Sequence, residues 1–299
     1  MVTLFAEVAM TYIEVREMQR RQQYARQNIS VQKDALALAQ ERYATGLSSQ
    51  LDVVQANATL GMTEAALPDL ETAKNQALYR LAVLLGENPG SLSGEFATHA
   101  AIPRPAGPIA LGLPVDVVRQ RPDVRAAERR LAAQTAQVGV ATAALYPSFT
   151  LSGFIGLQTR SVNDLFSSNS EMWGASLPVS WNLFDGGRVR SNIELQKELT
   201  QTRLLEYRQS VLQALAEVES ALVSYNNEHE KLAALRRATA ATEEGVRLAM
   251  VQYDTGLTDY SNVMIMQRDL FQLQEQLAAS EAQLDFDLIA LYKAVGGGW

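Results

Sequence analysis

Apolar residues recur every seven positions along two long stretches of the chain. In the later stretch the series runs from Leu204 to Tyr253 and resumes, after a short break, at Val263. The earlier stretch shows the same spacing from Val8 onward and again from Val53. A sustained seven-residue period corresponds to 3.5 residues per turn, which is typical of helices that supercoil around partner helices. We therefore expect long α-helices packed as coiled coils.

The two stretches are copies of one unit. The sequence matches itself at a constant offset of 210 residues, which pairs residues 6–86 with 216–296. Within this alignment YATGL at 43–47 falls on YDTGL at 253–257. A Gly at that point is typical of a helix end in the left-handed conformation, and the polar residues that follow can cap a returning helix. Each copy is therefore predicted to be an antiparallel helical hairpin.

The first helix of the second copy is predicted to be very long. Residues 187–253 contain no Pro, and Gly245 is the only Gly inside the segment. At 1.5 Å per residue these positions form a rod of about 100 Å. A helix of this length is typical of a coiled coil, a stalk or a tube rather than of a compact globular domain.

The segment between the two copies has a different character. Residues 87–114 are rich in Gly, Pro and Ser, which predicts a wrapping connection. A short helix should begin at Pro122 and end near Leu145, because Pro147 follows. The predicted organisation is a first helical repeat over 1–86, an equatorial connection with its helix over 87–147, a strand hairpin over 148–184, a second helical repeat over 185–296 and a tail over 297–299.

The predicted strand hairpin consists of two runs in which apolar and polar residues alternate. They cover residues 149–158 and 173–183, with a polar loop between them. The second run has 11 residues, within the range of about 9–11 expected of a tilted membrane-spanning strand. Trp173 and Trp181 lie near its two ends on the apolar face, as in an aromatic girdle. A soluble hairpin packed on a helix fits these residues equally well, but the run continues directly into the long helix and leaves no obvious layer to cover it.

Composition narrows the possible functions. The chain has 299 residues, a net charge of −7 and no Cys. The charge argues against a nucleic-acid partner, and the lack of Cys excludes disulfides and thiolate chemistry. His99 and His229 are isolated, and the sequence has no phosphate-binding Gly loop and no nucleophile elbow. We therefore predict no enzyme, no cofactor and no metal site; a coiled-coil scaffold stays open as an alternative to a channel.

Several motifs, in one order along nearly the whole chain, carry a family resemblance. They are RYATGL at 42–47 with LDVVQA at 51–56, LP at 113–114, RPDV at 121–124, YPSF at 146–149, LFDGG at 183–187 and LYKAVGGGW at 291–299. On these motifs the chain resembles the TolC-type outer-membrane efflux proteins, particularly the OprM/NodT-like branch.

The resemblance implies a fold, a location and partners. The fold would be mainly α: long antiparallel helical hairpins that form a trimeric α-barrel in the periplasm, with strands contributing to a β-barrel in the lipid of the outer membrane. The implied function is a passive exit duct of a tripartite efflux pump. A periplasmic adaptor would couple the homotrimer to an inner-membrane transporter, commonly of the resistance-nodulation-division type. Metal efflux and type I protein secretion share this architecture and stay open.

The sequence departs from the family in one respect. Family members carry a strand hairpin before each helical unit, whereas this sequence has one only before the second unit. We therefore expect it to be the C-terminal portion of a longer protein, whose signal peptide, any lipidated N-terminal Cys and first strand pair lie upstream. Such a portion supplies too few strands for the expected barrel, so we expect it not to form a native channel alone.

The resemblance also implies site residues at the two hairpin tips. In the family these turns meet the adaptor, which here would involve Thr45, Gly46, Leu47, Ser48, Thr255, Gly256, Leu257 and Thr258. An exposed Leu beside a tight Gly turn suits such a contact. The alternative is that each Gly is present only to end a helix.

The helices just past the tips line the closed periplasmic aperture in the family. Asp52, Gln55 and Arg268 match the family pattern. Ile265 stands where relatives usually have an Asp, so three-fold symmetry would give a hydrophobic constriction in place of an anionic one. For Asp52 the alternative role is stabilisation of its own helix N-terminus. For Arg121 we expect a structural role at the start of the short helix.

Overall fold

The computed structural model describes residues 2–98, 100–103, 121–160, 166 and 170–296. The helices are α1 (Val2–Ala44), α2 (Gln50–Leu85), the 3-10 turn η1 (Ser91–Ser93), α4 (Pro122–Ala143), α5 (Arg188–Asp254) and α6 (Tyr260–Ala294). The strands are β1 (Ser148–Phe149), β2 (Ser152–Leu157), β3 (Glu171–Ser176) and β4 (Val179–Ser180). The chain forms two compact units, residues 1–120 with 214–299 and residues 121–213. Within the described part, no helix is both long and apolar enough to cross a membrane.

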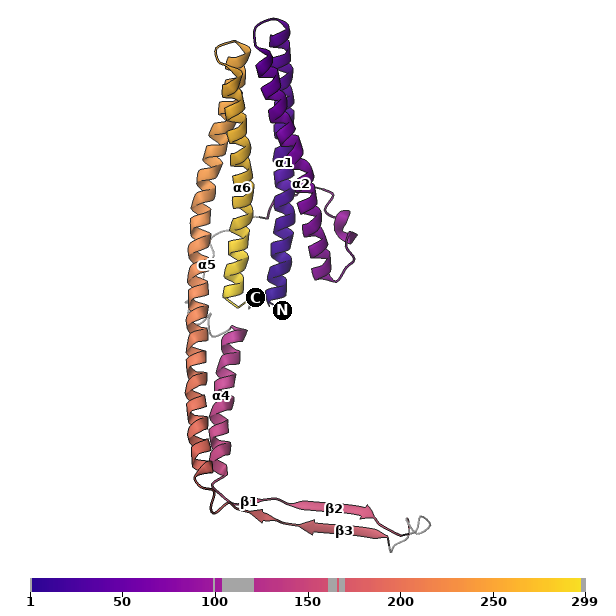
Figure 1. Cartoon of the computed structure of the whole chain (residues 1–299), viewed down its shortest axis with the longest axis vertical. Coiled ribbons are helices and arrows are strands. Elements are labelled where there is room, and N and C mark those ends of the chain that lie inside the picture. Colours follow the sequence, from indigo (N-terminus) through magenta and orange to yellow (C-terminus); the bar gives the residue numbers. More distant parts are fainter. Residues whose placement is uncertain (1, 99, 104–120, 161–165, 167–169, 297–299) are drawn as a thin grey trace. The chain divides into compact units, whose positions relative to one another are not determined.

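The first unit is built from the two predicted helical hairpins. Helix α1 packs against both α2 and α6, and Figure 1 shows the α1–α2 turn and the α5–α6 turn at the same end. The prediction of one unbroken helix from residue 188 is confirmed, since α5 runs for 67 residues. The seven-residue series also marks the core: its members Val218, Leu232, Thr239, Val246 and Tyr253 in α5 and Val263, Leu270, Leu277, Leu284 and Leu291 in α6 are all buried.

We call the buried members of this seven-residue series the seam. Along the seam, side chains from different helices meet in separate clusters. Beneath the two turns, small residues of α1, α2 and α5 surround the rings of Tyr253 and Tyr260. Farther along, Tyr24 of α1 packs with Leu232 of α5 and Leu277 of α6. Because these contacts join both hairpins, the first unit is one packed assembly and not two independent coiled coils.

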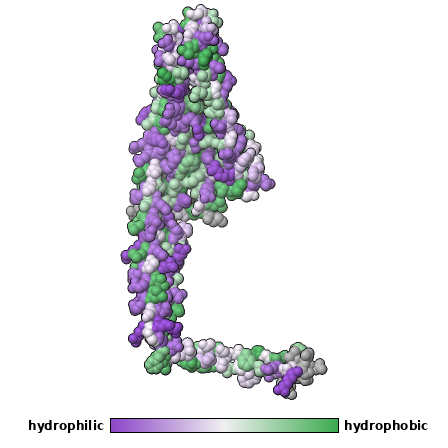
Figure 2. Space-filling view, in the orientation of Figure 1, coloured by the Kyte–Doolittle hydropathy of each residue, from purple (hydrophilic) through white to green (hydrophobic). Residues whose placement is uncertain are grey.

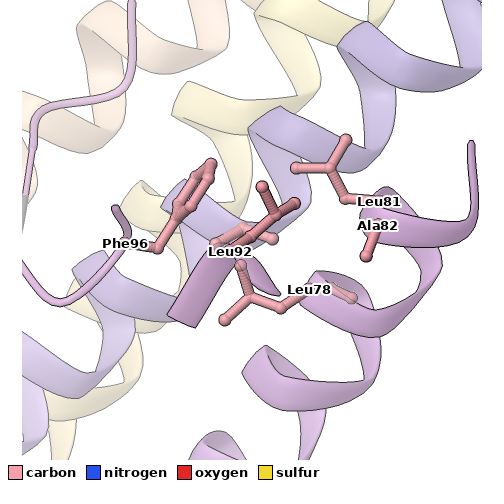
Figure 3. Packing of buried hydrophobic residues seen from close by; sticks show 7 residues of the cluster. Leu78, Leu81, Ala82, Leu92 and Phe96 are labelled. Atoms are coloured by element: carbon pink, nitrogen blue, oxygen red, sulfur yellow. The ribbon is translucent and has the colours of Figure 1, made fainter. Parts of the chain in front are cut away.

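Residues 91–98 lie across α1 and α2, and we call them the strap. Leu92 and Phe96 insert between the two helices and contact Leu78 and Leu81 (Figure 3). The guanidinium of Arg16 lies 4.6 Å from the centroid of the Phe96 ring and donates a hydrogen bond to the Thr98 carbonyl. Gln19 donates to the Phe96 carbonyl at 2.7 Å. The strap is thus held by apolar burial and by two polar side chains of α1. Residues 104–114 of the expected wrapping connection lie outside the described residues.

The strand hairpin differs from its prediction in one detail. We expected a single strand over 173–183, and this is wrong: β3 pairs with β2 and β4 pairs with β1, with an interruption between them. Pro178 falls in the interruption and has no N–H to donate, so one ladder hydrogen bond is missing there, although both strand pairs keep one register. Its carbonyl still accepts a hydrogen bond from the Thr150 N–H at 3.1 Å. The strand residues are exposed on both faces, and Figure 2 shows neutral and apolar residues over the visible face.

The second unit holds the short helix and the start of α5. Helix α4 begins at Pro122 as predicted, and Arg121 pairs with Asp123 at 2.8 Å, a structural role. Asp185 accepts hydrogen bonds from the backbone N–H groups of Gly187 and Val189. These bonds stabilise the ionised carboxylate and hold the pKa of Asp185 below its usual range. The Asp185-Gly186-Gly187 motif therefore starts α5.

We predict that Phe96→Ala frees the strap. The substitution removes a buried ring and leaves a cavity, which should cost about 3–5 kcal/mol of local stability. Hydrogen exchange should then accelerate at the amides of residues 91–98 and leave those of α6 unchanged. The neighbouring exposed residue provides the control, because Glu95→Ala should change nothing. Equal exchange in both variants would contradict this account of the strap.

Candidate functional site

The two hairpin turns have the same backbone geometry. Gly46 and Gly256 both have φ of 76°, in the left-handed region that favours Gly. The Leu47 N–H donates to the Arg42 carbonyl, and the Leu257 N–H donates to the Gln252 carbonyl, each at 2.8 Å. These are the bonds of a Schellman helix end, in which the chain turns back and satisfies the last free carbonyls. The internal repeat therefore encodes two equivalent turns, which we call tip 1 (residues 45–48) and tip 2 (residues 255–258).

Each tip presents one apolar side chain to solvent. Leu47 is 66% exposed and Leu257 is 79% exposed. The hydroxyls of Thr45 and Thr255 bond back to carbonyls of their own helices, while Ser48 and Thr258 are half-buried. Thus the exposed Leu is the part of each tip that is free for a contact with another molecule.

Arg42 joins the two tips. It lies at the end of α1, and its Nη1 donates a hydrogen bond of 2.6 Å to the carbonyl of Asp254 at the end of α5. The same guanidinium lies 4.9 Å from the centroid of the Tyr253 ring. A cation at a helix C-terminus is favourable because the free carbonyls carry partial negative charge. Arg42 therefore holds the end of α5 against tip 1.

Tyr253 and Asp52 make a second link between the hairpins. The Tyr253 hydroxyl donates to Asp52 Oδ2 at 3.1 Å, and Ser49 donates to the other carboxylate oxygen of Asp52 at 3.1 Å. The Tyr253 ring meets the Tyr260 ring edge to face, with centroids 5.4 Å apart. Burial raises the pKa of Tyr260 to about 12, so both rings stay neutral at physiological pH. We call Arg42, Asp52 and Tyr253 the latch.

The predicted aperture residues lie near the latch, on α2 and α6. Asp52 belongs to the first turn of α2, so the expected helix-stabilising role and the link to Tyr253 both use its carboxylate. Gln55 is half-buried, whereas Ile265 and Arg268 are exposed on α6. The 210-residue offset makes Gln55 and Ile265 equivalent positions of the two hairpins. Their role in an aperture stays a prediction.

The two tryptophans of the predicted girdle have different surroundings. Trp173 lies in β3 opposite Ile155 and is largely exposed. Trp181 follows β4, and its ring N–H donates to the Leu145 carbonyl at 3.1 Å. Trp181 thus fastens the end of the hairpin to the segment that follows α4. The membrane role of both residues stays a prediction.

Sequence reasoning missed two of the three latch residues. It selected Asp52 but neither Arg42 nor Tyr253. A signal was present, because the offset pairs Arg42 with Gln252 and so places a charged residue in one copy only. Among the residues that the structure describes, no three His, Asp or Glu side chains gather in a way that could hold a metal ion.

The fold is that of solved outer-membrane channels. The outer-membrane channel OprN superimposes on this chain with a TM-score of 0.90 and 35% sequence identity. The match covers 100% of this chain and 67% of the OprN chain. It covers 69% of a CusC chain, from a study of conformational changes during folding and transmembrane channel formation, with a TM-score of 0.85 and 25% identity. For the outer membrane protein VceC of Vibrio cholerae the TM-score is 0.83 at 26% identity.

Sequence comparison gives the family. The model for "Outer membrane efflux protein" matches residues 1–87 and 113–297. The chain belongs to the outer membrane efflux protein family. The predictions of family, mainly α fold and bacterial outer-membrane localisation are thereby confirmed, and the family is one of channel proteins rather than enzymes, as predicted.

Curated relatives agree with this assignment. Nodulation protein T of Rhizobium leguminosarum bv. trifolii is 31% identical over 297 residues, which cover 98% of this chain and 63% of the relative. The toluene efflux pump outer membrane protein TtgF of Pseudomonas putida is 30% identical, with 62% of its length covered. The outer membrane protein OprJ of Pseudomonas aeruginosa is also 30% identical, with 62% covered. The chain thus spans less than two thirds of the length of these relatives.

We predict that the latch couples the two hairpins energetically. Tyr253→Phe removes only the hydroxyl that bonds Asp52, and Asp52→Asn weakens the same bond from the other side. Each change should cost about 0.5–1.5 kcal/mol. In a double-mutant cycle on thermal or denaturant unfolding the two costs should be clearly less than additive. The control pair Tyr253→Phe with Asp69→Asn, a distant carboxylate of α2, should be additive; additivity in the first pair would remove Asp52 from the latch.

Proposed function

We propose that this chain supplies the periplasmic duct of an outer-membrane channel in a tripartite efflux pump. In this proposal the duct is a passive conduit, and tips 1 and 2 form its docking end. The observation that carries the proposal is the pair of equivalent tips, side by side at one end of the helices, each with an exposed Leu on a rigid Schellman turn. Two equivalent exposed Leu side chains suit a partner that carries repeated apolar pockets.

The partners we propose are two further copies of the chain, a periplasmic adaptor and an inner-membrane transporter. Exposed apolar residues of α5 support the homotrimer. Apolar residues of α5 outside the packed seam are exposed in the single chain: Leu205, Leu212, Val223, Leu248 and Val251. A long helix with apolar residues on a second side requires further helices, and neighbouring copies in a closed ring can supply them.

The cargo we propose is small molecules. The names of two relatives refer to a toluene efflux pump and to pyoverdine export. A passive duct imposes little selection of its own, so the inner-membrane transporter would choose the cargo. Within the duct, selection would fall on charge at the narrowest point, where we propose that Gln55, Ile265 and Arg268 lie.

The absence of Cys from the sequence allows a clean docking test. We predict that Leu47→Cys and Leu257→Cys variants form cross-links to the adaptor when the introduced thiol carries a short maleimide-linked benzophenone, which inserts into C–H bonds of a bound partner on illumination. The adaptor and transporter would be those encoded beside the gene, co-expressed with the channel. Val83→Cys serves as the control, because Val83 is 65% exposed but lies at the other end of α2 from the tips. Equal cross-linking of all three variants, or of Val83→Cys alone, would argue against docking at the tips.

The constriction is tested by charge. We predict that Ile265→Asp makes the assembled channel more selective for cations, because three-fold symmetry turns one carboxylate into a ring of three. Planar-bilayer recordings of reversal potential in a salt gradient would measure the shift. Val83→Asp adds the same charge to an exposed position at the other end of α2 and is the control. If both variants shift the potential equally, Ile265 does not line the narrowest point.

A further inference from the structure

Asp285 is a buried acid whose Oδ2 atom has no hydrogen-bond partner among the described residues. It lies on α6 and is 6% exposed, next to the seam residue Leu284. Its Oδ2 atom is inaccessible to solvent and has no hydrogen-bond partner within the described part of the chain. A buried carboxylate is ordinarily paired with a cation or with several N–H donors, because removal of its charge from water is costly. Asp285 therefore calls for a compensating group.

A cavity lies beside this side chain. Its volume is about 230 Å³, and its walls come from α1, α5, α6 and residues 101–103. Figure 1 shows α1, α5 and α6 side by side in this part of the molecule, and the contacts of Tyr24, Leu232 and Leu277 agree. Apart from the charged groups, the lining is apolar, with Ile102, Leu232 and Leu284 among its members. Besides Asp285, the wall carries the charged side chains of Arg20, Arg236 and Glu281.

Among the described residues on the cavity wall, neither guanidinium forms an ion pair with Asp285. Arg236 of α5 pairs with Glu281 at 3.0 Å. Arg20 of α1 lies 4.5 Å from the centroid of the Tyr24 ring and donates to Gln23. Glu281 of α6 is itself an acid and adds repulsion. Burial, reinforced by Glu281, raises the pKa of Asp285 to about 6. Above that pH the carboxylate is ionised and not neutralised by either guanidinium.

We propose that this cavity binds a small organic cation: a primary ammonium group paired with the Asp285 carboxylate, attached to a compact apolar body that contacts Leu232, Leu284 and Ile102. An ammonium group brings the positive charge and the N–H donors that the carboxylate lacks. The apolar body gains from leaving water. A neutral molecule of the same shape would gain the second contribution only. The site lies away from the tips and the latch, and it does not depend on the proposed channel function.

The experiment compares two probes of equal shape on the purified chain. Benzylammonium should bind at pH 8, and benzyl alcohol should bind at least tenfold more weakly, as measured by calorimetry or ligand-observed NMR. Below pH 6 the benzylammonium affinity should fall, because protonation of Asp285 removes the charge. Binding of both probes with equal affinity, or no benzylammonium binding at millimolar concentration, would overturn the proposal.

Variants identify the site. Asp285→Asn keeps the shape and removes the charge, so benzylammonium affinity should fall at least tenfold. Asp287→Asn is the matched control: it makes the same change on the same helix, but Asp287 accepts a hydrogen bond from Gln283 and does not line the cavity. Ala101→Trp keeps the carboxylate and fills the cavity, so it too should abolish binding. This variant keeps the test decisive if Asp285→Asn folds poorly.

Thermal melting without ligand checks folding. At pH 8 Asp285→Asn should melt at a higher temperature than the natural chain, since it removes a buried unpaired charge. Unchanged binding in Asp285→Asn or Ala101→Trp would place the amine elsewhere.

Discussion

A helix of 67 residues cannot bury its own apolar seam, and this constraint organises the first unit. Because every second turn of the second half of α5 carries a seam residue, α6 must run beside it, and α1 and α2 must cover the other side. Small residues make the close approach possible near the tips, where Ala35, Ala39, Ala56 and Ala249 are all buried. The space that they leave is filled by Tyr253 and Tyr260. The position of tip 1 relative to tip 2 along the helices is therefore set by this packing and not by the turns themselves.

Polar residues inside the seam fix the register of the helices. Asn28 of α1 donates to Gln274 of α6, and Gln22 of α1 donates to Glu71 of α2. An apolar seam alone tolerates a shift of one heptad, because leucines are interchangeable. Each buried polar pair is satisfied in one register only, so a shift would leave its donors and acceptors unpaired. Such pairs cost some stability in exchange for a single alignment, and the alignment is what brings Arg42 to the end of α5.

Local sequence patterns predicted the helices and turns, but they did not predict the contacts between the hairpins. The seven-residue period and the 210-residue offset gave both hairpins, both Gly turns and the unbroken α5, because each follows from neighbours in sequence. The strand break did have a local signal in Pro178, but the alternation of the residues around it concealed the missing N–H. The latch and the Asp285 cavity had little or no such signal. Asp285 directly follows a seam residue, and only the packing of a third helix turns that polar position into a buried one.

The repeat explains the tips but not the latch, and this difference has a mechanical consequence. The backbone and Thr hydroxyl hydrogen bonds that shape tip 1 and tip 2 lie within their own hairpins. Between the hairpins, Arg42 bonds the Asp254 carbonyl and Tyr253 bonds Asp52. Arg42 has no basic counterpart in the second copy, where the equivalent residue is Gln252. The second hairpin therefore has no guanidinium at that position to make the equivalent bond to the end of α1. Loss of these contacts would loosen the link between the two tips, while each Schellman turn and its exposed Leu keep their geometry. The Asn28–Gln274 pair and the seam would still hold the register of the helices, so the latch acts on the tips and not on the alignment of the hairpins.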